Sequence, residues 1–279
     1  MLPLTDWPIE ERRRIIGVFT DIDDTLTTEG AITPDALNAL GELKDACLHV
    51  IAITGRPVGW SVPFAQGDTA SGIAPWPVDA IVAENGSVAL FTHKKGLKAT
   101  TDKRTQLSKL YQQDTQTRAH NLARMQQVAQ RVLREVPGAT LSQDSSGRET
   151  DIAFDHSEFN HLSAEKIASI VRIMQSEGMN ATVSSIHINA WFGDHNKLAG
   201  ARWIVRELLG RALDDEIGQW VYVGDSTNDQ LMFEHFPHSV GVSNIRRFEA
   251  ELTHLPRYIT PSGRGAGFAE AARAILSAR

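Results

Sequence analysis

Short apolar runs recur along the chain, and most of them end at a group of polar residues. Continuous apolar runs of this kind are typical of strands that are buried on both faces. Between the runs lie segments with helical periodicity, the first of which has Thr33 as its N-cap and Pro34 at its first helical position. Strands that alternate with helices predict a parallel sheet covered by helices on both faces, which is the α/β class. The expected strands cover residues 15–20, 49–53, 80–83, 219–223 and 240–242.

The middle of the chain follows a different pattern. One long amphipathic helix is expected there, and the sequence leaves open whether it breaks near Asp114. Two further segments alternate between apolar and polar side chains, which is typical of half-exposed antiparallel strands. The expected elements are a helix over about 102–136, strands at 150–154 and 185–192, and a helix over about 163–176.

These two patterns predict an α+β domain inserted into the α/β core. Ligands of open parallel sheets bind beside the carboxyl ends of the strands, so the polar groups at those ends are the first candidates for a site. The expected boundaries are residues 1–87 for the first part of the core, 88–190 for the inserted domain and 191–279 for the second part of the core.

Asp21 and Asp23 lie two residues apart just after the first predicted strand, so both carboxylates can face one crevice. Two close carboxylates repel each other unless a cation is present, and Mg²⁺ prefers oxygen ligands of this kind. With Mg²⁺ beside it, Asp21 is a candidate nucleophile toward phosphorus, and Asp23 is a candidate general acid and base. The alternative is an acidic turn that only caps the next helix, and the pair alone does not decide between them.

Three later segments offer further groups of the same kind. Thr54 and Gly55 present a hydroxyl and a backbone N–H that suit a phosphate oxygen, although a simple turn has the same composition. Lys197, just before a predicted helix over 198–209, can bring an ammonium group to phosphate, although an isolated lysine is usually solvated. Asp225 and Asp229 repeat the pattern of two carboxylates after a strand and can add oxygen ligands for Mg²⁺.

Taken in order, these four segments resemble the signature motifs of the haloacid dehalogenase-like (HAD) phosphatase superfamily, and the resemblance spans nearly the whole chain. The resemblance implies a Rossmann-like core. It also implies that Asp21 is the nucleophile, that Asp23 is the general acid and base, and that Thr54 and Lys197 bind the phosphoryl group. The Mg²⁺ ligands that it implies are Asp21, the backbone carbonyl of Asp23, and Asp225, with Asp229 in support.

The position of the inserted domain narrows the resemblance. The insertion falls between Thr54 and Lys197, as in C2-type caps, and the chain looks most like the IIB branch. That branch includes sucrose-phosphate and mannosyl-3-phosphoglycerate phosphatases and the Cof-like sugar phosphatases. The segments 83–86 and 259–268 are also similar to it. One departure is Asp24, where related proteins often have glycine, and we do not read this change as inactivating.

Hydrolysis of a small phosphomonoester, either a sugar phosphate or a glycosyl-phosphoglycerate, is the function that this resemblance implies. Phosphoryl transfer to a sugar, as in phosphosugar mutases, shares the first half of the chemistry and stays open. A phosphometabolite-binding protein without activity is a further alternative, and its mark would be the loss of one reacting group. All of these groups are present.

Residues in the inserted domain are candidates for substrate contact. In the alternating segment at 185–192, His187, Asn189 and Trp191 fall on one face, and Trp191 is a candidate platform for a sugar ring. The alternative is that this face is solvated or packs on the helices of the inserted domain. Arg56, directly after Thr54 and Gly55, is a further candidate for contact with the substrate or with the inserted domain.

Composition changes this picture only slightly. The chain has 279 residues and a net charge of −6, which argues against nucleic acid as a partner. This charge does not exclude a local basic pocket for a small phosphorylated metabolite, which is the partner that the resemblance implies. Cys47 is the only cysteine, so no intramolecular disulfide can form, and this fits a reducing compartment. No apolar run approaches the ~20 residues of a membrane span. A cytoplasmic protein without a membrane partner is therefore expected, and the sequence does not indicate an oligomeric state.

Overall fold

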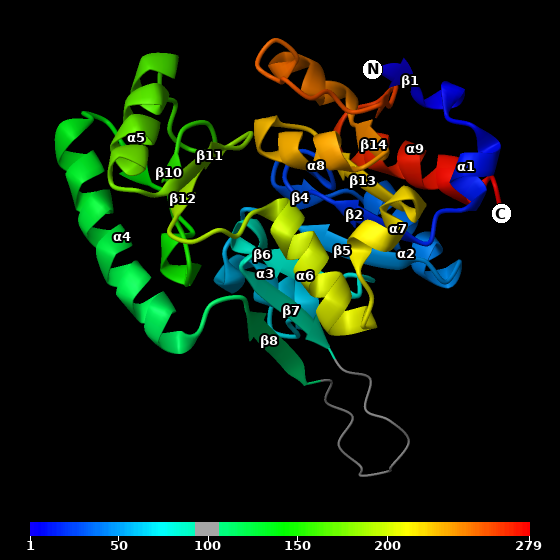
Figure 1. The fold of residues 1–279 in the computed structure, drawn as a ribbon, viewed down its shortest axis with the longest axis horizontal. Helices are drawn as coiled ribbons and strands as arrows, with labels where there is room; N and C mark the ends of the chain where they lie inside the picture. The colour runs from blue at the N-terminus through cyan, green and yellow to red at the C-terminus, as the bar shows by residue number, and fades with distance from the viewer. Residues whose placement is uncertain (93–105) are drawn as a thin grey trace.

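The structure is a computed structural model that describes residues 1–92 and 106–279, and these residues form one large sheet, one smaller sheet and a short hairpin (Figure 1). Within these residues the large sheet has nine strands. The first seven in the spatial order given next run parallel, and the last two, β7 and β8, are antiparallel to their neighbours. In spatial order the strands are β1 (Leu2–Pro3), β15 (Tyr258–Ile259), β14 (His238–Gly241), β13 (Trp220–Gly224), β2 (Gly17–Thr20), β5 (His49–Ile53), β6 (Ala80–Ala83), β7 (Val88–Thr92) and β8 (Leu107–Tyr111).

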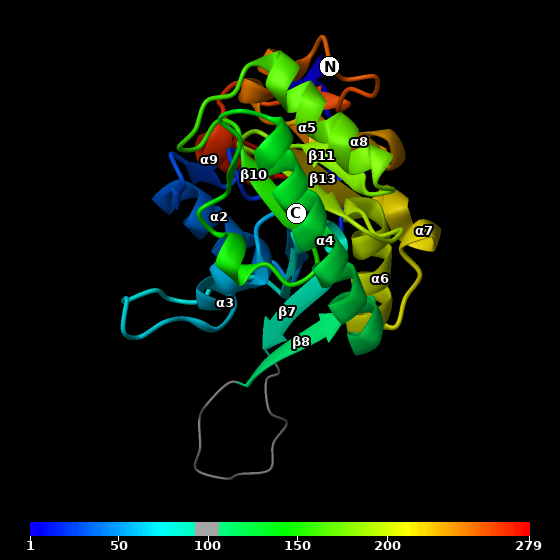
Figure 2. The same ribbon diagram turned by 90° about the vertical axis from the view of Figure 1, so that its left-hand side faces the viewer.

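Helices cover both faces of the large sheet, as Figures 1 and 2 show. Buried side chains of α2, α3 and α9 form an apolar cluster with one face of the sheet. Side chains of α6, α7 and α8 form a second cluster with the other face. The predicted α/β core is therefore confirmed. The helices are α1 (Ile9–Arg13), α2 (Pro34–Asp45), α3 (Val58–Gln66), α6 (Lys197–Leu209), α7 (Leu213–Glu216), α8 (Gln230–His235) and α9 (Arg264–Leu276).

The smaller sheet belongs to the inserted domain, which we call the cap and define as residues 115–191. All of its strands pair antiparallel, and α4 and α5 pack on it around a third apolar cluster. In Figure 1 the cap lies to the left of the large sheet. The predicted insertion of an α+β domain is confirmed. Its elements are α4 (Thr115–Glu135), β9 (Thr140–Leu141), β10 (Ile152–Asp155), α5 (Ala164–Ser176), β11 (Asn180–Val183) and β12 (His187–Trp191).

The start of the cap differs from the prediction. Residue 88 does not begin the cap, because β7 and β8 hydrogen-bond to the large sheet and extend it. The helix expected over 102–136 is also too long, because residues 107–111 form β8. Pairing with β7 decides the conformation of that segment, which local periodicity does not reveal. The helix begins at Thr115, where the side chain of Asp114 accepts a hydrogen bond from Thr117 N at 2.9 Å. Residues 102–105 of the prediction lie outside the described residues.

Helix α6 follows the segment that leads from the cap back to the core, and it packs closely against the turn after β6. That turn, Glu84–Gly86, contains Gly86 with a φ of +107°, a conformation that favours glycine. A Cβ atom added to Gly200 in α6 would lie 2.6 Å from the Cα atom of Gly86. The absence of a side chain at both positions therefore lets the helix that begins with Lys197 approach the sheet.

Alanine substitutions at two helical glycines, one at this close approach and one away from it, should have opposite effects on stability. Gly200→Ala should lower the free energy of unfolding by about 1–3 kcal/mol, because the new methyl group meets backbone atoms. Gly41→Ala in α2 is the matched control, since a Cβ atom there would meet nothing within 4 Å. That variant should gain about 0.5–1 kcal/mol from helix propensity. Urea unfolding of both variants measures this, and equal effects would contradict the packing argument.

Candidate active site

Three neighbouring strands bring the predicted site residues to one edge of the large sheet. β13, β2 and β5 lie side by side and parallel, so their carboxyl ends meet. Asp225 follows β13, Asp21 follows β2 and Thr54 follows β5. Lys197 is the first residue of α6, whose N-cap Asn196 accepts a hydrogen bond from Ala199 N at 2.9 Å. The parallel topology therefore assembles residues that are as many as two hundred positions apart in the sequence.

A buried lysine lies between two buried carboxylates. Lys197 Nζ is 2.7 Å from Asp21 Oδ1 and 2.6 Å from Asp229 Oδ1. Burial raises the pKa of Asp21 to about 7, although Lys197 acts in the opposite direction. Burial by itself would lower the pKa of Lys197, but Asp21 and Asp229 outweigh that effect and raise it. The lysine therefore stays charged and holds Asp21 in a fixed position.

Asp225 completes a group of carboxylates that fits a divalent cation. Oxygen atoms of Asp21, Asp225 and Asp229 lie within 4.8 Å of one another. Burial raises the pKa of Asp225 well above its ordinary value, and the carboxylates of Asp21 and Asp229 raise it further. The cations nearby are Lys197, which pairs with Asp21 and Asp229, and Arg247, which pairs with Asp225 at 3.1 Å. A divalent cation would relieve the repulsion between the carboxylates that raises the pKa of Asp225. Mg²⁺ is suited to such an oxygen-rich site.

The hydrogen bonds distinguish the ligands from the supporting residue. Asp225 Oδ1 is buried and has no hydrogen-bond partner in the described part of the chain, so it is available to a metal ion. Asp229 already uses both of its oxygen atoms. Its Oδ1 accepts from Lys197 and from the Tyr222 hydroxyl, and its Oδ2 accepts from the backbone N–H groups of Asp225 and Ser226 at 2.9 and 3.1 Å. Asp229 therefore fits the role of positioning Lys197 and Asp225 better than that of a direct ligand.

Asp23 is held by Arg56 rather than by the lysine. Arg56 Nε donates to both Asp23 oxygens, at 2.9 and 3.0 Å. The same guanidinium forms ion pairs with Glu158 at 2.8 Å and Asp144 at 3.3 Å, and both of these residues belong to the cap. It also lies over the ring of Trp60, 5.1 Å from the ring centroid. Arg56 thus connects the expected acid and base to the cap, which agrees with its prediction as a contact to that domain.

Thr54 and Gly55 lie beside this arginine. Thr54 Oγ1 accepts a hydrogen bond from Arg56 N at 3.0 Å, so the hydroxyl hydrogen remains available for a phosphate oxygen. The Gly55 carbonyl accepts from two cap residues, Asn189 at 3.2 Å and Arg148 at 3.0 Å. The segment after β5 therefore contacts the cap through the Gly55 carbonyl, whereas the hydroxyl hydrogen of Thr54 is not used in these contacts.

The face of β12 that carries His187 and Asn189 is buried against other residues. His187 Nε2 is 2.8 Å from Glu158, and Asn189 bridges Gly55 and Asp151. The side chains of His187 and Asn189 are therefore buried against polar groups rather than solvated. Asn189 contacts the core at Gly55, and His187 contacts Glu158, which in turn pairs with Arg56.

The proposed role of Trp191 as a platform for a sugar ring is wrong for this structure. Trp191 is 2% exposed and belongs to the apolar cluster of the cap. Its indole Nε1 donates to the backbone carbonyl of His195 at 2.8 Å, and its ring stacks on the ring of His195. The return linker, residues 192–196, covers the tryptophan. Strand alternation identifies which side chains share a face, but not what lies against that face.

Sequence reasoning missed several residues at the contact between cap and core. Glu84 is fully buried, and its carboxylate accepts hydrogen bonds from Val58 N and from the backbone of Glu149 and Thr150. Glu158 and Asp144 hold Arg56, as described above. Within the core, Arg247 was also missed, and its Nη2 donates to Asp24 Oδ2 at 2.9 Å. No spacing or periodicity marks Glu158, Asp144 or Arg247, because their partners are distant in the sequence.

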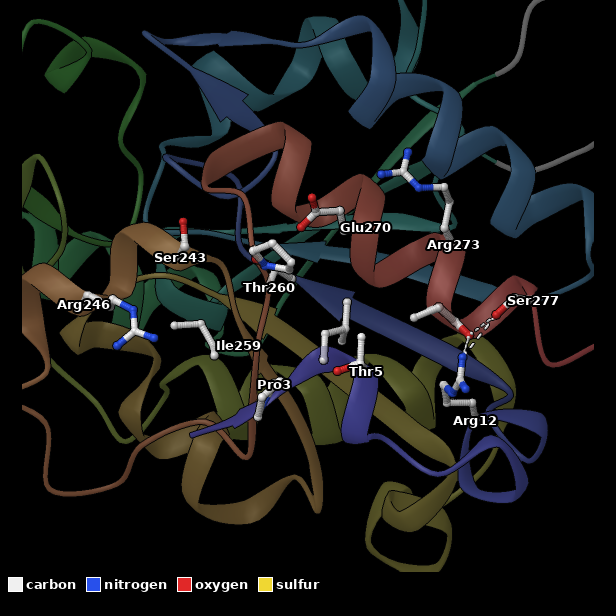
Figure 3. A pocket seen from close by; sticks show the side chains of 13 residues that line it. Pro3, Thr5, Arg12, Ser243, Arg246, Ile259, Thr260, Glu270, Arg273 and Ser277 are labelled. Carbon is white, nitrogen blue, oxygen red and sulfur yellow. Dashed lines mark hydrogen bonds between the residues drawn. The ribbon is translucent and has the colours of Figure 1, made fainter.

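Pockets for small molecules typically have volumes of about 300–1,000 Å³. A cavity of about 630 Å³ lies between the cap and the core next to Asp23. Its wall combines side chains from both domains, including the aromatic rings of Trp60 and Phe159. A second cavity, of about 750 Å³, lies near the N-terminus and α9 (Figure 3). Neither Asp23 nor Arg56 lines this second cavity, and its wall is formed by residues such as Arg12 and Ile259. The cavity beside Asp23 is therefore the candidate substrate site.

Comparison with known proteins identifies the family. Residues 18–174, which are more than half of the chain, match the family model of the haloacid dehalogenase-like hydrolases. The chain therefore belongs to this family of hydrolases, and the family inferred from the motifs is confirmed. A search of curated proteins gave no match.

Solved structures share this fold across almost their whole length. A HAD/COF-like hydrolase from Plasmodium vivax has a TM-score of 0.66 and 14% identity, with 98% of this chain and 100% of that chain covered. Sucrose-phosphatase from Synechocystis sp. PCC6803, in complex with sucrose and phosphate, has a TM-score of 0.62 and 16% identity, with 95% and 98% covered. A HAD subclass IIB sugar phosphatase has a TM-score of 0.58 and 13% identity, with 94% and 99% covered. The expected Rossmann-like core with a IIB-type cap is therefore confirmed as the fold.

No helix among residues 1–92 and 106–279 is long and apolar enough to span a membrane.

His195, in the return linker just before Lys197, is buried without a polar partner. Neither ring nitrogen has a hydrogen bond in the described part of the chain, and the ring stacks on Trp191 with the centroids 5.3 Å apart. Burial lowers the pKa of His195 to about 4. The imidazole is therefore neutral in the folded protein near neutral pH.

The burial of His195 predicts that acid lowers the stability of the folded protein. The histidine of the unfolded chain has a pKa of about 6.5, so between pH 6.5 and pH 4 the unfolded state binds a proton that the folded state excludes. The free energy of unfolding should fall by about 2 kcal/mol from pH 7 to pH 5 through this residue. His195→Phe keeps the stacking and should remove that loss in urea unfolding, whereas His161→Asn at an exposed position should not. Equal acid sensitivity of wild type and His195→Phe would contradict the assignment.

Proposed function

We propose that this protein is a Mg²⁺-dependent phosphomonoester hydrolase that forms a phospho-aspartate at Asp21. The observation that carries the proposal is the buried group at the strand ends, in which Lys197 holds Asp21 and the unpartnered Oδ1 of Asp225 lies close by. A carboxylate that is excluded from water and held by an ammonium group is positioned to act as a nucleophile. Membership in the haloacid dehalogenase-like hydrolases supports the same chemistry.

Each residue in this proposal has a separate task. An oxygen of Asp21 bonds to phosphorus as the bond from phosphorus to the leaving oxygen breaks, and Asp23 donates a proton to that leaving oxygen. Asp23 then accepts a proton from water, which attacks phosphorus and releases Asp21. Thr54 and Lys197 bind the phosphoryl oxygens, with the Gly55 backbone beside them.

The cation would be held by Asp21, Asp225 and the backbone carbonyl of Asp23. When bound, Mg²⁺ would offset the repulsion between carboxylates and phosphate and would polarise the phosphoryl group. Asp229 supports this set through its hydrogen bonds to Lys197 and to the backbone of Asp225.

A phosphorylated sugar or a glycosyl-phosphoglycerate is the substrate class that we propose. The cavity of about 630 Å³ matches a small metabolite and lies between the expected acid Asp23 and the cap. The aromatic walls of Trp60 and Phe159 can contact the apolar face of a sugar ring. Sucrose-phosphatase and a IIB sugar phosphatase are among the proteins with the same fold, which also supports this class.

Removal of the nucleophile tests the mechanism directly. Asp21→Asn should reduce Mg²⁺-dependent hydrolysis of p-nitrophenyl phosphate and glucose 6-phosphate by about a thousandfold or more, because the amide cannot form the phospho-enzyme. Asp45→Asn, at an exposed position of α2, should keep full activity. Acid quenching during turnover, followed by peptide mass spectrometry, should find a phosphoryl group on Asp21. Turnover near the wild-type rate in Asp21→Asn would refute the mechanism.

Metal binding can be measured without any substrate. Mg²⁺ at about one hundred times its dissociation constant should stabilise the wild type by about 2.7 kcal/mol, as seen in a thermal shift. Asp225→Asn should lose this shift, because the amide removes a charged ligand. Since that change also relieves repulsion with Asp21 and Asp229, the metal-free variant should be no less stable than the metal-free wild type. An unchanged Mg²⁺ response in Asp225→Asn would exclude this residue as a ligand.

A further inference from the structure

Asp24 holds two arginines beside the candidate substrate site. Asp24 Oδ2 accepts from Arg247 Nη2 at 2.9 Å, and Asp24 Oδ1 is 3.1 Å from Arg264 Nε. Both arginines are about 40% exposed, and all three residues line the cavity of about 630 Å³. Asp23 and Arg56 line the same cavity, so the two arginines share a cavity with the expected general acid and base.

The backbone around this pair of arginines is held in an unusual conformation. Asp24 has a φ of +54° and Arg264 a φ of +55°, which side chains other than glycine rarely adopt. Asn244 connects the two segments. Its Nδ2 donates to the Asp24 carbonyl at 3.1 Å and to Asp225 Oδ2 at 2.8 Å, and its Oδ1 accepts from Arg264 N at 2.8 Å. Strained conformations that neighbouring hydrogen bonds hold in place are concentrated at functional sites.

Arg264 and Arg247 differ in how their charges are paired. Arg264 is bound only through its Nε, and its terminal N–H groups have no hydrogen-bond partner within the described residues. Arg247 shares its charge between Asp24 and Asp225. The other charged side chains that line the cavity are Asp23, Glu29, Arg56 and Glu158, and Arg56 is paired with Asp23 and Glu158. Arg264 therefore offers the cavity N–H donors that no carboxylate of the described residues occupies.

We infer that Arg264, with Arg247 beside it, binds a second anionic group on the leaving group of the substrate, either a carboxylate or a second phosphate. Guanidinium groups bind both of these anions through paired N–H donors. Asp24 is a positioning residue, because it orients the two arginines and does not itself contact the substrate. This inference rests on the proposed function, and it narrows the substrate class from phosphorylated sugars in general to those that carry a further acid group.

Matched substrates test the inference through one ratio, the specificity constant for the acid-bearing member divided by that for its neutral counterpart. One pair is 6-phosphogluconate and glucose 6-phosphate, and the other is fructose 1,6-bisphosphate and fructose 6-phosphate. The first pair tests a carboxylate and the second tests a second phosphate. The wild type should prefer at least one acid-bearing member.

Arg264→Gly is the informative variant, because a φ of +55° is favourable for glycine and the change should not strain the backbone. The ratio should fall about tenfold or more, mainly through a higher KM for the acid-bearing member, since charge-assisted hydrogen bonds are lost. Arg264→Lys should recover part of the ratio. Arg246→Ala is the matched control, because Arg246 is exposed, lies next to Arg247 in the sequence and does not line this cavity. The control should leave the ratio unchanged.

The outcomes separate this inference from the proposed function. If no substrate is hydrolysed by the wild type with Mg²⁺, the proposed function fails and this inference fails with it. If the wild type hydrolyses these substrates but Arg264→Gly leaves the ratio unchanged, or lowers both specificity constants equally, then only the inference fails. In that case the role of Arg264 would be limited to its ion pair with Asp24.

Discussion

The buried ammonium of Lys197 between Asp21 and Asp229 is the interaction on which the rest of the site depends. Carboxylates that are excluded from water stay charged only when a cation lies within reach, and the removal of one partner from a buried pair typically costs about 3–5 kcal/mol. Lys197 begins the helix by which the chain returns from the cap. The same contact therefore joins the two parts of the core and orients the expected nucleophile.

The contact between cap and core uses the same strand ends as the chemistry. Arg56 pairs with Asp23 on one side and with Asp144 and Glu158 of the cap on the other. Gly55 accepts hydrogen bonds from the cap one residue earlier in the chain. Because these residues adjoin Thr54, the position of the cap and the geometry around the expected acid and base are physically connected. Access of water and substrate to Asp23 should depend on that connection.

Prediction from the sequence succeeded where a structural requirement is local. Thr33 accepts the hydrogen bond expected of an N-cap, and the apolar runs before Asp21, Thr54 and Asp225 form parallel strands. Prediction failed where a partner that is distant in the sequence decides the conformation or the surroundings of a segment. Residues 107–111 pair with β7 and extend the core sheet, and Trp191 is covered by the return linker. Neither outcome follows from periodicity, because period and alternation describe one element and not its neighbours.

The amino-acid sequence by itself determined the class of fold and the family, and it indicated the candidate residues Asp21, Thr54 and Asp225, since each of them directly follows a strand whose apolar pattern is visible. Only the tertiary structure decided which carboxylate is free for a metal ion, because Asp225 and Asp229 differ in their hydrogen bonds and not in their sequence context. It also decided that Asp24 gathers Arg247 and Arg264. These arginines lie more than two hundred residues from Asp24, and only folding brings their charges together.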